Sequence, residues 1–145
     1  MEYIHYGHKN FDIEKFDAIK NCEYFSKPQG GLWASRINAE YGWKDWCKGA
    51  NFTTCEQNNS FKFTLSADAN ILEIHKSEDL EGLPKLQSEQ MPILASRHLD
   101  FEQLVRDGYD GVELFLSDDQ RLYWDLYGWD CDSIVIFNPN CIITL

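Results

Sequence analysis

Short apolar runs separated by turn residues are the dominant pattern of the chain, and they predict a protein built largely of strands. The runs are rich in β-branched and aromatic residues, which are typical of strands, and turn-forming residues stand at their ends. The predicted strands cover residues 2–6, 32–35, 61–66, 71–75, 111–116, 133–137 and 141–144. Seven short strands of this kind indicate a β-rich core.

Fewer segments follow the period of a helix. Residues 37–48 carry apolar and aromatic groups at helical spacing and predict one helix. Asp100, followed by Gln103, predicts the start of a second helix, which Gly108 would end. Residues 77–80 and 117–124 predict short helical turns, and residues 57–60 and 82–92 predict loops. Short helices between strands that look antiparallel favour the α+β class over a regular βαβ alternation.

Composition indicates one ordered domain. The whole chain, residues 1–145, shows neither an internal repeat nor a linker long enough to separate domains. Hydrophobic residues make up 43% of it and aromatic residues 14%, which excludes a disordered chain. No apolar run approaches the length needed to span a bilayer, and the first residues lack a signal-peptide pattern. We therefore expect a cytoplasmic protein without a membrane partner.

Charge and cysteine content narrow the possible partners. The net charge of -11 should repel phosphate backbones, so a protein partner is expected ahead of a nucleic acid. The five cysteines are widely spaced, which favours reduced thiols over a disulfide framework. The histidines lack the paired spacing of a zinc site, so no metal is expected.

Three separate stretches combine the residue types that chemistry on a glycosidic bond requires. Backbone groups beside a glycine can approach a ligand closely, aromatic rings can stack on it, and a carboxylate can stabilise positive charge that develops on a ribose carbon. The stretches cover residues 3–7, 27–35 and 129–137, and each lies at or near a predicted strand. Their candidate residues are His5, Tyr6 and Gly7; Gly31, Trp33 and Ser35; and Asp132.

Together these stretches resemble the ADP-ribosyltransferase superfamily, and in particular a compact bacterial or phage version of its poly(ADP-ribose) polymerase-like branch. The resemblance implies an ADP-ribosyltransferase-like split sheet, two opposed and mostly antiparallel sheets with short flanking helices and an NAD cleft between them. It implies that His5 positions a ribose, that Gly7 holds the nicotinamide amide, and that Trp33, with Tyr41 or Trp43, forms the wall around the nicotinamide. Gly31 would belong to the second-strand motif of that branch.

The chain departs from the family pattern at two of these places. Tyr6 stands between His5 and Gly7, where the family has an adjacent His-Gly pair, and neighbouring strand residues point to opposite faces. Either His5 or Tyr6 could therefore face the ligand, and we favour His5. Asp132 stands where the family has glutamate, one methylene longer. Ser35 is similar to the strand serine of the toxin branch.

The resemblance implies an NAD-dependent mono-ADP-ribosyltransferase, toxin- or effector-like, that uses His5, Trp33 and Asp132 in catalysis. The acceptor would be an unknown macromolecule. Three alternatives stay open: an NAD glycohydrolase, an enzyme that resembles RNA 2′-phosphotransferases, and a catalytically degenerate member that binds a protein partner.

Overall fold

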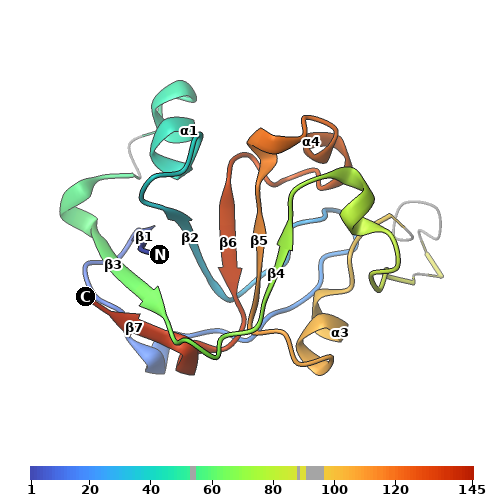
Figure 1. Cartoon of the computed structure of the whole chain (residues 1–145), viewed down its shortest axis with the longest axis horizontal. Coiled ribbons are helices and arrows are strands. Elements are labelled where there is room, and N and C mark those ends of the chain that lie inside the picture. Colours follow the sequence, from blue (N-terminus) through green and yellow to red (C-terminus); the bar gives the residue numbers. More distant parts are fainter. Residues whose placement is uncertain (53–54, 88, 91–96) are drawn as a thin grey trace.

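A computed structural model describes residues 1–52, 55–87, 89–90 and 97–145 of the chain. Its centre is a seven-stranded mixed sheet with the strand order β4-β5-β6-β2-β1-β3-β7 (Figure 1). The strands are β1 (Tyr3–Tyr6), β2 (Leu32–Arg36), β3 (Ser60–Leu65), β4 (Ile71–Ile74), β5 (Gly111–Leu114), β6 (Ser133–Ile136) and β7 (Ile142–Thr144). All seven predicted strands are confirmed, with ends that differ by one or two residues, and so is the α+β class.

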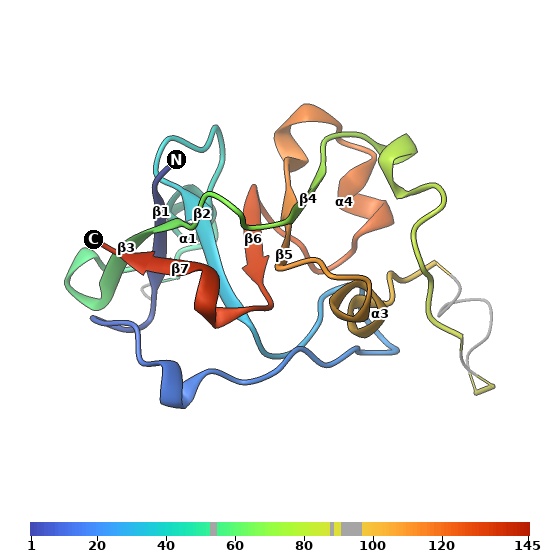
Figure 2. The ribbon, with the colours of Figure 1, turned by 60° about the horizontal axis from the view of Figure 1, so that its bottom comes forward.

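The sheet is continuous, which corrects the expectation of two opposed sheets. β1 and β2 form the central junction, and they pair at only two positions, Tyr3 with Arg36 and Ile4 with Ser35. Beyond those positions the strands separate, so β1, β3 and β7 form one half of the bent sheet and β2, β6, β5 and β4 the other (Figures 1 and 2). Only the β4–β5 pair is parallel.

The helices are short and lie around the sheet. They are α1 (Trp43–Gly49), α3 (Phe101–Arg106) and α4 (Leu122–Asp125), with 3-10 turns η1 (Ile13–Lys15), η2 (Gln57–Asn59), η3 (Ser77–Leu80), η4 (Leu116–Asp118) and η5 (Pro139–Cys141). Asp100 caps α3 as predicted, since its side chain accepts from the backbone N–H of Gln103. The predicted loop 57–60 contains η2, and residues 88 and 91–92 of the predicted loop 82–92 lie outside the described residues.

The helix predicted over 37–48 begins later than expected. Residues 37–42 form turns and an extended link, and α1 starts only at Trp43. Gly42 precedes it in an extended conformation, and its N–H donates to the carboxylate of Asp45 at 3.0 Å. This capping contact fixes the helix start, because it satisfies a backbone donor that the first turn cannot pair.

Two hydrophobic clusters cover the two faces of the sheet. Along β6, Val135 belongs to one cluster while Ile134 and Ile136 belong to the other. This alternation follows from the two-residue period of a strand, and it makes β6 buried on both faces. The first cluster also takes in α3, α4 and Trp129, and the second packs β1, β2 and β3 around Phe63.

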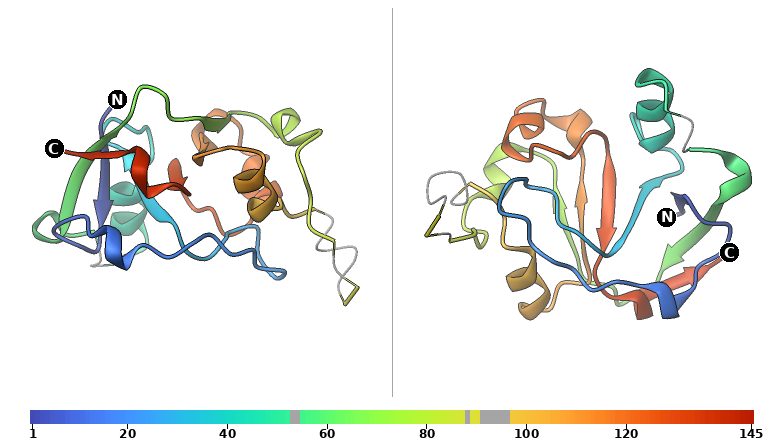
Figure 3. Two further views of the ribbon diagram at one scale, coloured as in Figure 1. Left: turned by 90° about the horizontal axis from the view of Figure 1, so that it is seen from below. Right: turned by 180° about the vertical axis from the view of Figure 1, so that it is seen from behind.

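The segment between β1 and β2 crosses the molecule to α3 and returns, as Figure 3 shows from below and from behind. The side chain of Asn21 joins the far end of this segment to the start of α3. Its oxygen accepts from Phe101 N at 2.8 Å, and its NH2 group donates to Asp100 at 2.7 Å. Both chain ends lie beside β3, where Met1 O accepts from Thr64 and Leu145 N donates to Lys62 O.

Cys47 and Cys55 form a disulfide, which corrects the expectation that the thiols are all reduced. Their Cα atoms lie 6.2 Å apart, within the usual range for such a bond. The bond joins α1 to the segment that leads into β3. Sequence spacing alone could not pair them, because an odd set of cysteines without a recognisable framework has many possible connections.

Among the described residues, no helix has the length and apolar character needed to cross a bilayer.

Candidate functional site

The three predicted stretches lie on three adjacent strands, because β2 pairs with β1 on one side and with β6 on the other. Both pairings are antiparallel. Beyond Ile4 the strands β1 and β2 diverge, with His5 Nδ1 still 2.7 Å from Trp33 O, and Asp132 lies beside the last residues of β2. The stretches are neighbours, but their candidate residues point to different places.

Asp132 is buried and its carboxylate is held by donors from two loops. One oxygen accepts from Ser117 N at 2.8 Å; the other accepts from Ser117 Oγ at 2.7 Å and from Tyr41 N at 3.3 Å. The backbone N–H of Asp132 also donates to Tyr41 O. This residue therefore connects the loop before α1 with the loop that leads into β6. Its carboxylate has little unpaired capacity left for a ligand.

Ser35 joins the same assembly from β2. Its buried hydroxyl donates to Asp132 O at 2.8 Å and accepts from Trp43 N at 2.9 Å. Trp43 N is one of the first backbone donors of α1, which have no partner inside the helix. The hydroxyl predicted to meet the cofactor thus orients α1 against the sheet.

His5 does not share a surface with Trp33 and Asp132, which corrects the preferred register. Its ring packs on Phe61 at 5.0 Å, beside the second hydrophobic cluster, whereas Trp33 packs against the first. His5 Nδ1 lies 2.7 Å from Trp33 O; because a carbonyl only accepts, Nδ1 carries the proton. Burial lowers the pKa of His5. Its Nε2 is then an acceptor for His8 Nδ1 at 3.0 Å.

Tyr6 takes the place that was expected for His5. It lines a pocket of about 390 Å³ between the end of β1, the end of β2 and α1. Burial, and then the nearby carboxylate of Asp45, raise the pKa of the Tyr6 hydroxyl. The other lining residues are Ile4, Ser35, Arg36, Ile37, Ala39, Gly42, Trp43, Lys44, Asp45 and Lys48. The stretch at the end of β1 therefore presents a phenol, and not an imidazole, to this pocket.

Both glycines of the predicted site have a structural role in the fold. Gly7 has φ of 117°; its N–H donates to Asn59 O at 2.8 Å and its carbonyl accepts from Asn59 Nδ2 at 2.9 Å. The N–H of Gly7 is therefore not available to a nicotinamide amide while Asn59 stays in place, and its carbonyl already accepts one hydrogen bond. Gly31 allows a close approach, since a Cβ there would stand 2.7 Å from Ile136 O.

A lysine occupies the space between the two tryptophans expected to stack on nicotinamide. The ammonium of Lys27 lies 4.7 Å from the ring centroids of both Trp33 and Trp43. Burial lowers the pKa of Lys27, and the charge of Asp130 opposes that shift. Trp33 is further fixed by Trp129, at 4.8 Å between ring centroids. The indole of Trp33 is thus already in contact with two groups of the chain, the ammonium of Lys27 and the ring of Trp129.

Trp43 has one feature that the other aromatic residues of the site lack. Its Nε1 is buried and has no hydrogen-bond partner among the described residues. An unpaired buried donor carries a desolvation penalty of about 1–3 kcal/mol, which a ligand acceptor could remove. Lys44 and Lys48 are exposed on the same helix and line the same pocket.

Tyr41 belongs to a second pocket, on the other side of α1. This pocket has a volume of about 520 Å³ and lies between α1 and the segment 116–130. Its lining is dominated by aromatic rings and contains one carboxylate; the residues are Tyr41, Trp46, Leu116, Ser117, Gln120, Tyr123, Trp124 and Asp130.

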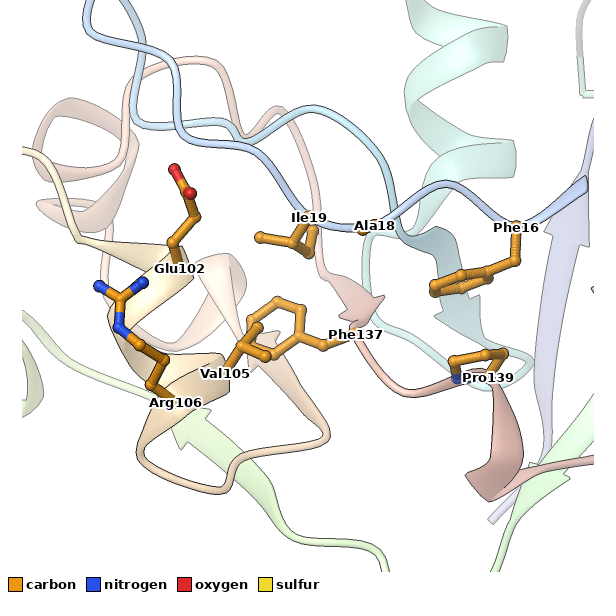
Figure 4. A pocket seen from close by; sticks show the side chains of 8 residues that line it. All are labelled: Phe16, Ala18, Ile19, Glu102, Val105, Arg106, Phe137 and Pro139. Atoms are coloured by element: carbon orange, nitrogen blue, oxygen red, sulfur yellow. The ribbon is translucent and has the colours of Figure 1, made fainter.

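A third hollow lies away from every predicted site residue. It has about 420 Å³ and is formed by the segment before β2, α3 and the residues after β6 (Figure 4). Apolar groups such as Ile19, Val105 and Phe137 form its floor, and Glu102 and Arg106 stand at one end. Of the three predicted stretches, residues 129–137 contribute Phe137 to it, and the other two contribute nothing.

Sequence reasoning missed the groups that occupy the site, namely Lys27, Lys44, Lys48, Asn59 and Ser117. The sequence could have indicated that Lys44 and Lys48 act together, because residues four apart on a helix lie on one face. No sequence pattern could have placed Lys27 on Trp33, since the turn that brings it there depends on two successive glycines with positive φ, at 77° and 68°. The described residues contain no cluster of three or more His, Cys, Asp or Glu side chains that could hold a metal.

A comparison with known proteins finds no match: no family model, no curated protein and no solved structure matches the chain.

Proposed function

We propose that the chain binds NAD in the pocket between β1, β2 and α1 and transfers its ADP-ribose to an acceptor. The motif resemblance supplies the reaction. The observation that carries the proposal is the pocket that Tyr6, Trp43, Lys44 and Lys48 line together, beside the buried Nε1 of Trp43, which has no partner among the described residues. The two ammonium groups would bind a pyrophosphate inside an otherwise acidic protein, and a turn of the Trp43 ring toward the pocket would bring its N–H to an acceptor atom of the ligand.

The proposal assigns roles that differ from the family pattern. Tyr6 takes the ribose-positioning role in place of His5, because Tyr6 lines the pocket and His5 packs beside Phe61. Trp43, and not Trp33, provides the binding indole. Gly7 contributes to the shape of the β1 end, with Asn59 as its partner.

Asp132 acts in this proposal as a fixed acceptor that holds Tyr41 and Ser117 in place. The negative charge of Asp132 would stabilise a positive charge that develops on the ribose. It would act across the pocket wall formed by Ser35, without contact between the Asp132 carboxylate and the ligand. Because donors already neutralise part of its charge, we expect slow transfer compared with an enzyme whose carboxylate is unpaired.

Titration calorimetry with NAD tests the binding step. We expect saturable binding by the wild-type chain at millimolar NAD or below, and a loss of about tenfold or more in affinity in a Lys44→Ala/Lys48→Ala variant. A Trp43→Phe variant keeps a ring but removes the N–H, and its affinity should fall by several-fold. The matched control is Lys20→Ala/Lys76→Ala, which removes the same charge from exposed positions outside the pocket.

Absence of NAD binding at millimolar concentration, or equal weakening by the two double variants, would overturn the proposal. Release of nicotinamide is then measured with and without candidate acceptor proteins. Release without an acceptor would identify a glycohydrolase.

A binding module without catalysis is the second candidate, and specific contacts favour it. The carboxylate of Asp132, the hydroxyl of Ser35 and both backbone groups of Gly7 are all paired within the chain. This candidate predicts NAD binding without nicotinamide release, or no NAD binding together with a measurable protein partner.

A further inference from the structure

The pocket between α1 and the segment 116–130 has the composition of a cation site. Four aromatic side chains line it, Tyr41 and Trp46 from one wall and Tyr123 and Trp124 from the other. Trp124 is 72% exposed and Tyr41 is 40% exposed, so their rings are accessible to a ligand. Soluble proteins bury most large aromatic surface, and a hollow lined by several exposed rings indicates a binding site.

One carboxylate accompanies the rings. Asp130 is half-buried in this pocket, and within the described ranges its side chain has neither a hydrogen bond nor a close ion pair, although its charge acts on the ammonium of Lys27. Its carboxylate oxygens are therefore free to face a ligand cation in the pocket. The chain's net charge of -11 also attracts cations toward the surface.

The polar groups of the pocket distinguish between kinds of cation. A guanidinium or a primary ammonium is best held by several strong acceptors placed around its N–H groups. The lining offers one carboxylate, that of Asp130, and one amide oxygen, that of Gln120, beside the hydroxyl groups of Ser117, Tyr41 and Tyr123. A cation without N–H donors needs none of these acceptors and gains most from aromatic faces.

The same region already holds one internal cation on indoles. Lys27 stands 4.7 Å from the ring centroids of Trp33 and Trp43, and Trp43 contacts Trp46 of this pocket in a T-shaped pair at 5.7 Å. The aromatic groups around α1 are therefore arranged in a way that accommodates positive charge.

We propose that the pocket formed by Tyr41, Trp46, Tyr123, Trp124 and Asp130 binds a quaternary or fully methylated ammonium group. The aromatic rings surround the methyl groups and Asp130 supplies the counter-charge. The site shares no lining residue with the proposed NAD pocket, and its test is made without NAD.

Titration with choline, followed by the chemical shifts of the tryptophan indole N–H groups, tests this inference on the full chain without NAD. The comparison ligand is the neutral carbon isostere of choline, which has the same shape and no charge. We expect choline to bind about tenfold or more tightly than the isostere. Equal affinity for the two compounds would overturn the inference, because it would show an apolar hollow only, and so would absence of saturable choline binding.

Two variants locate the site. Trp124→Ala and Asp130→Asn should each weaken choline binding by about tenfold. Their matched controls are Tyr24→Ala, an exposed aromatic in the segment before β2, and Asp68→Asn, an exposed acid; neither lines the pocket. Equal effects in variants and controls would overturn the assignment. A peptide with trimethyllysine and vesicles of phosphatidylcholine, compared with unmethylated peptide and phosphatidylglycerol vesicles, then identify the source of the group.

Discussion

Asp132 is held by donors from two separate loops, and its replacement tests what those hydrogen bonds contribute. Asp132→Ala leaves the Ser117 and Tyr41 N–H groups without their acceptor. We expect a loss of about 2–4 kcal/mol in the free energy of unfolding, because buried donors lose a charged partner. Urea unfolding measures this. Asp68→Ala, an exposed acid, is the control and should change stability little; an equally small effect of Asp132→Ala would contradict the structural role.

Two histidines should titrate on opposite sides of the ordinary value of 6.5. Burial lowers the pKa of His5, so its contribution to stability is present above pH 6.5 and is lost as the pH falls below it. The hydrogen bond to Asp118, then that to Glu73, raises the pKa of His75. The contribution of His75 is present below pH 6.5 and is lost as the pH rises through its folded value. NMR titration of the ring protons measures both midpoints; a shared midpoint would contradict the contacts.

At the scale of elements, strands were easier to predict from sequence than helices. In the strand at 133–136, Ser133 is followed by an apolar run, and the strand is buried on both faces. The helix after β2 starts at Trp43, six residues beyond the predicted start. Its start depends on Ser35 Oγ, which accepts from Trp43 N, and such a contact from another strand leaves no signal in a local sequence pattern.

The disulfide should stabilise α1 by restricting the chain that follows it. Cys47 and Cys55 are eight residues apart, and closing so short a loop contributes about 2–3 kcal/mol. Cys47→Ser/Cys55→Ser should lose this amount in urea unfolding. It should also expose the peptide bonds between α1 and β3 to limited proteolysis.

The control for the disulfide variant is Cys22→Ser, which removes a free, half-buried thiol. Reducing agent should lower the stability of the wild-type chain and of Cys22→Ser, but not that of the double variant. Equal sensitivity of all three to reductant would contradict a bond between Cys47 and Cys55.

For the whole molecule, sequence indicated which stretches are neighbours but not which atoms meet. Three stretches were expected together, and they lie on the adjacent strands β1, β2 and β6. Side-chain direction depends on a one-residue register, which places Tyr6 in the pocket and His5 on Phe61. Lys27 reaches the indoles through a loop that crosses the molecule, and no local pattern contains that path.

A buried network connects the two halves of the bent sheet. Glu113 on β5 accepts from Arg36 Nε at 2.6 Å on β2 and from the hydroxyl of Tyr3 at 3.1 Å on β1. Glu113→Ala would leave the guanidinium without its buried partner and should cost about 3–5 kcal/mol. The exposed pair of Arg121 with Glu78 provides the comparison: Glu78→Ala should change stability far less than Glu113→Ala, because solvent screens an exposed pair. Chemical unfolding of both variants measures the difference.

The same network should determine how the molecule responds to alkaline pH. Burial, followed by the charge of Glu113, raises the pKa of Tyr3 well above its ordinary value of 10. The unfolded chain then releases this proton at a lower pH than the folded chain, so the contribution of Tyr3 to stability is present below pH 10 and is lost as the pH rises beyond it.

Tyr3→Phe removes the titrating group and costs about 1 kcal/mol at neutral pH through the lost hydrogen bond. Because a phenylalanine ring cannot ionise, the variant should lose less stability than the wild type between neutral pH and high pH, and the two stability curves should converge. Thermal unfolding across this range measures both slopes. Parallel curves would show that Tyr3 ionises alike in the folded and unfolded chains, which would contradict its burial against Glu113.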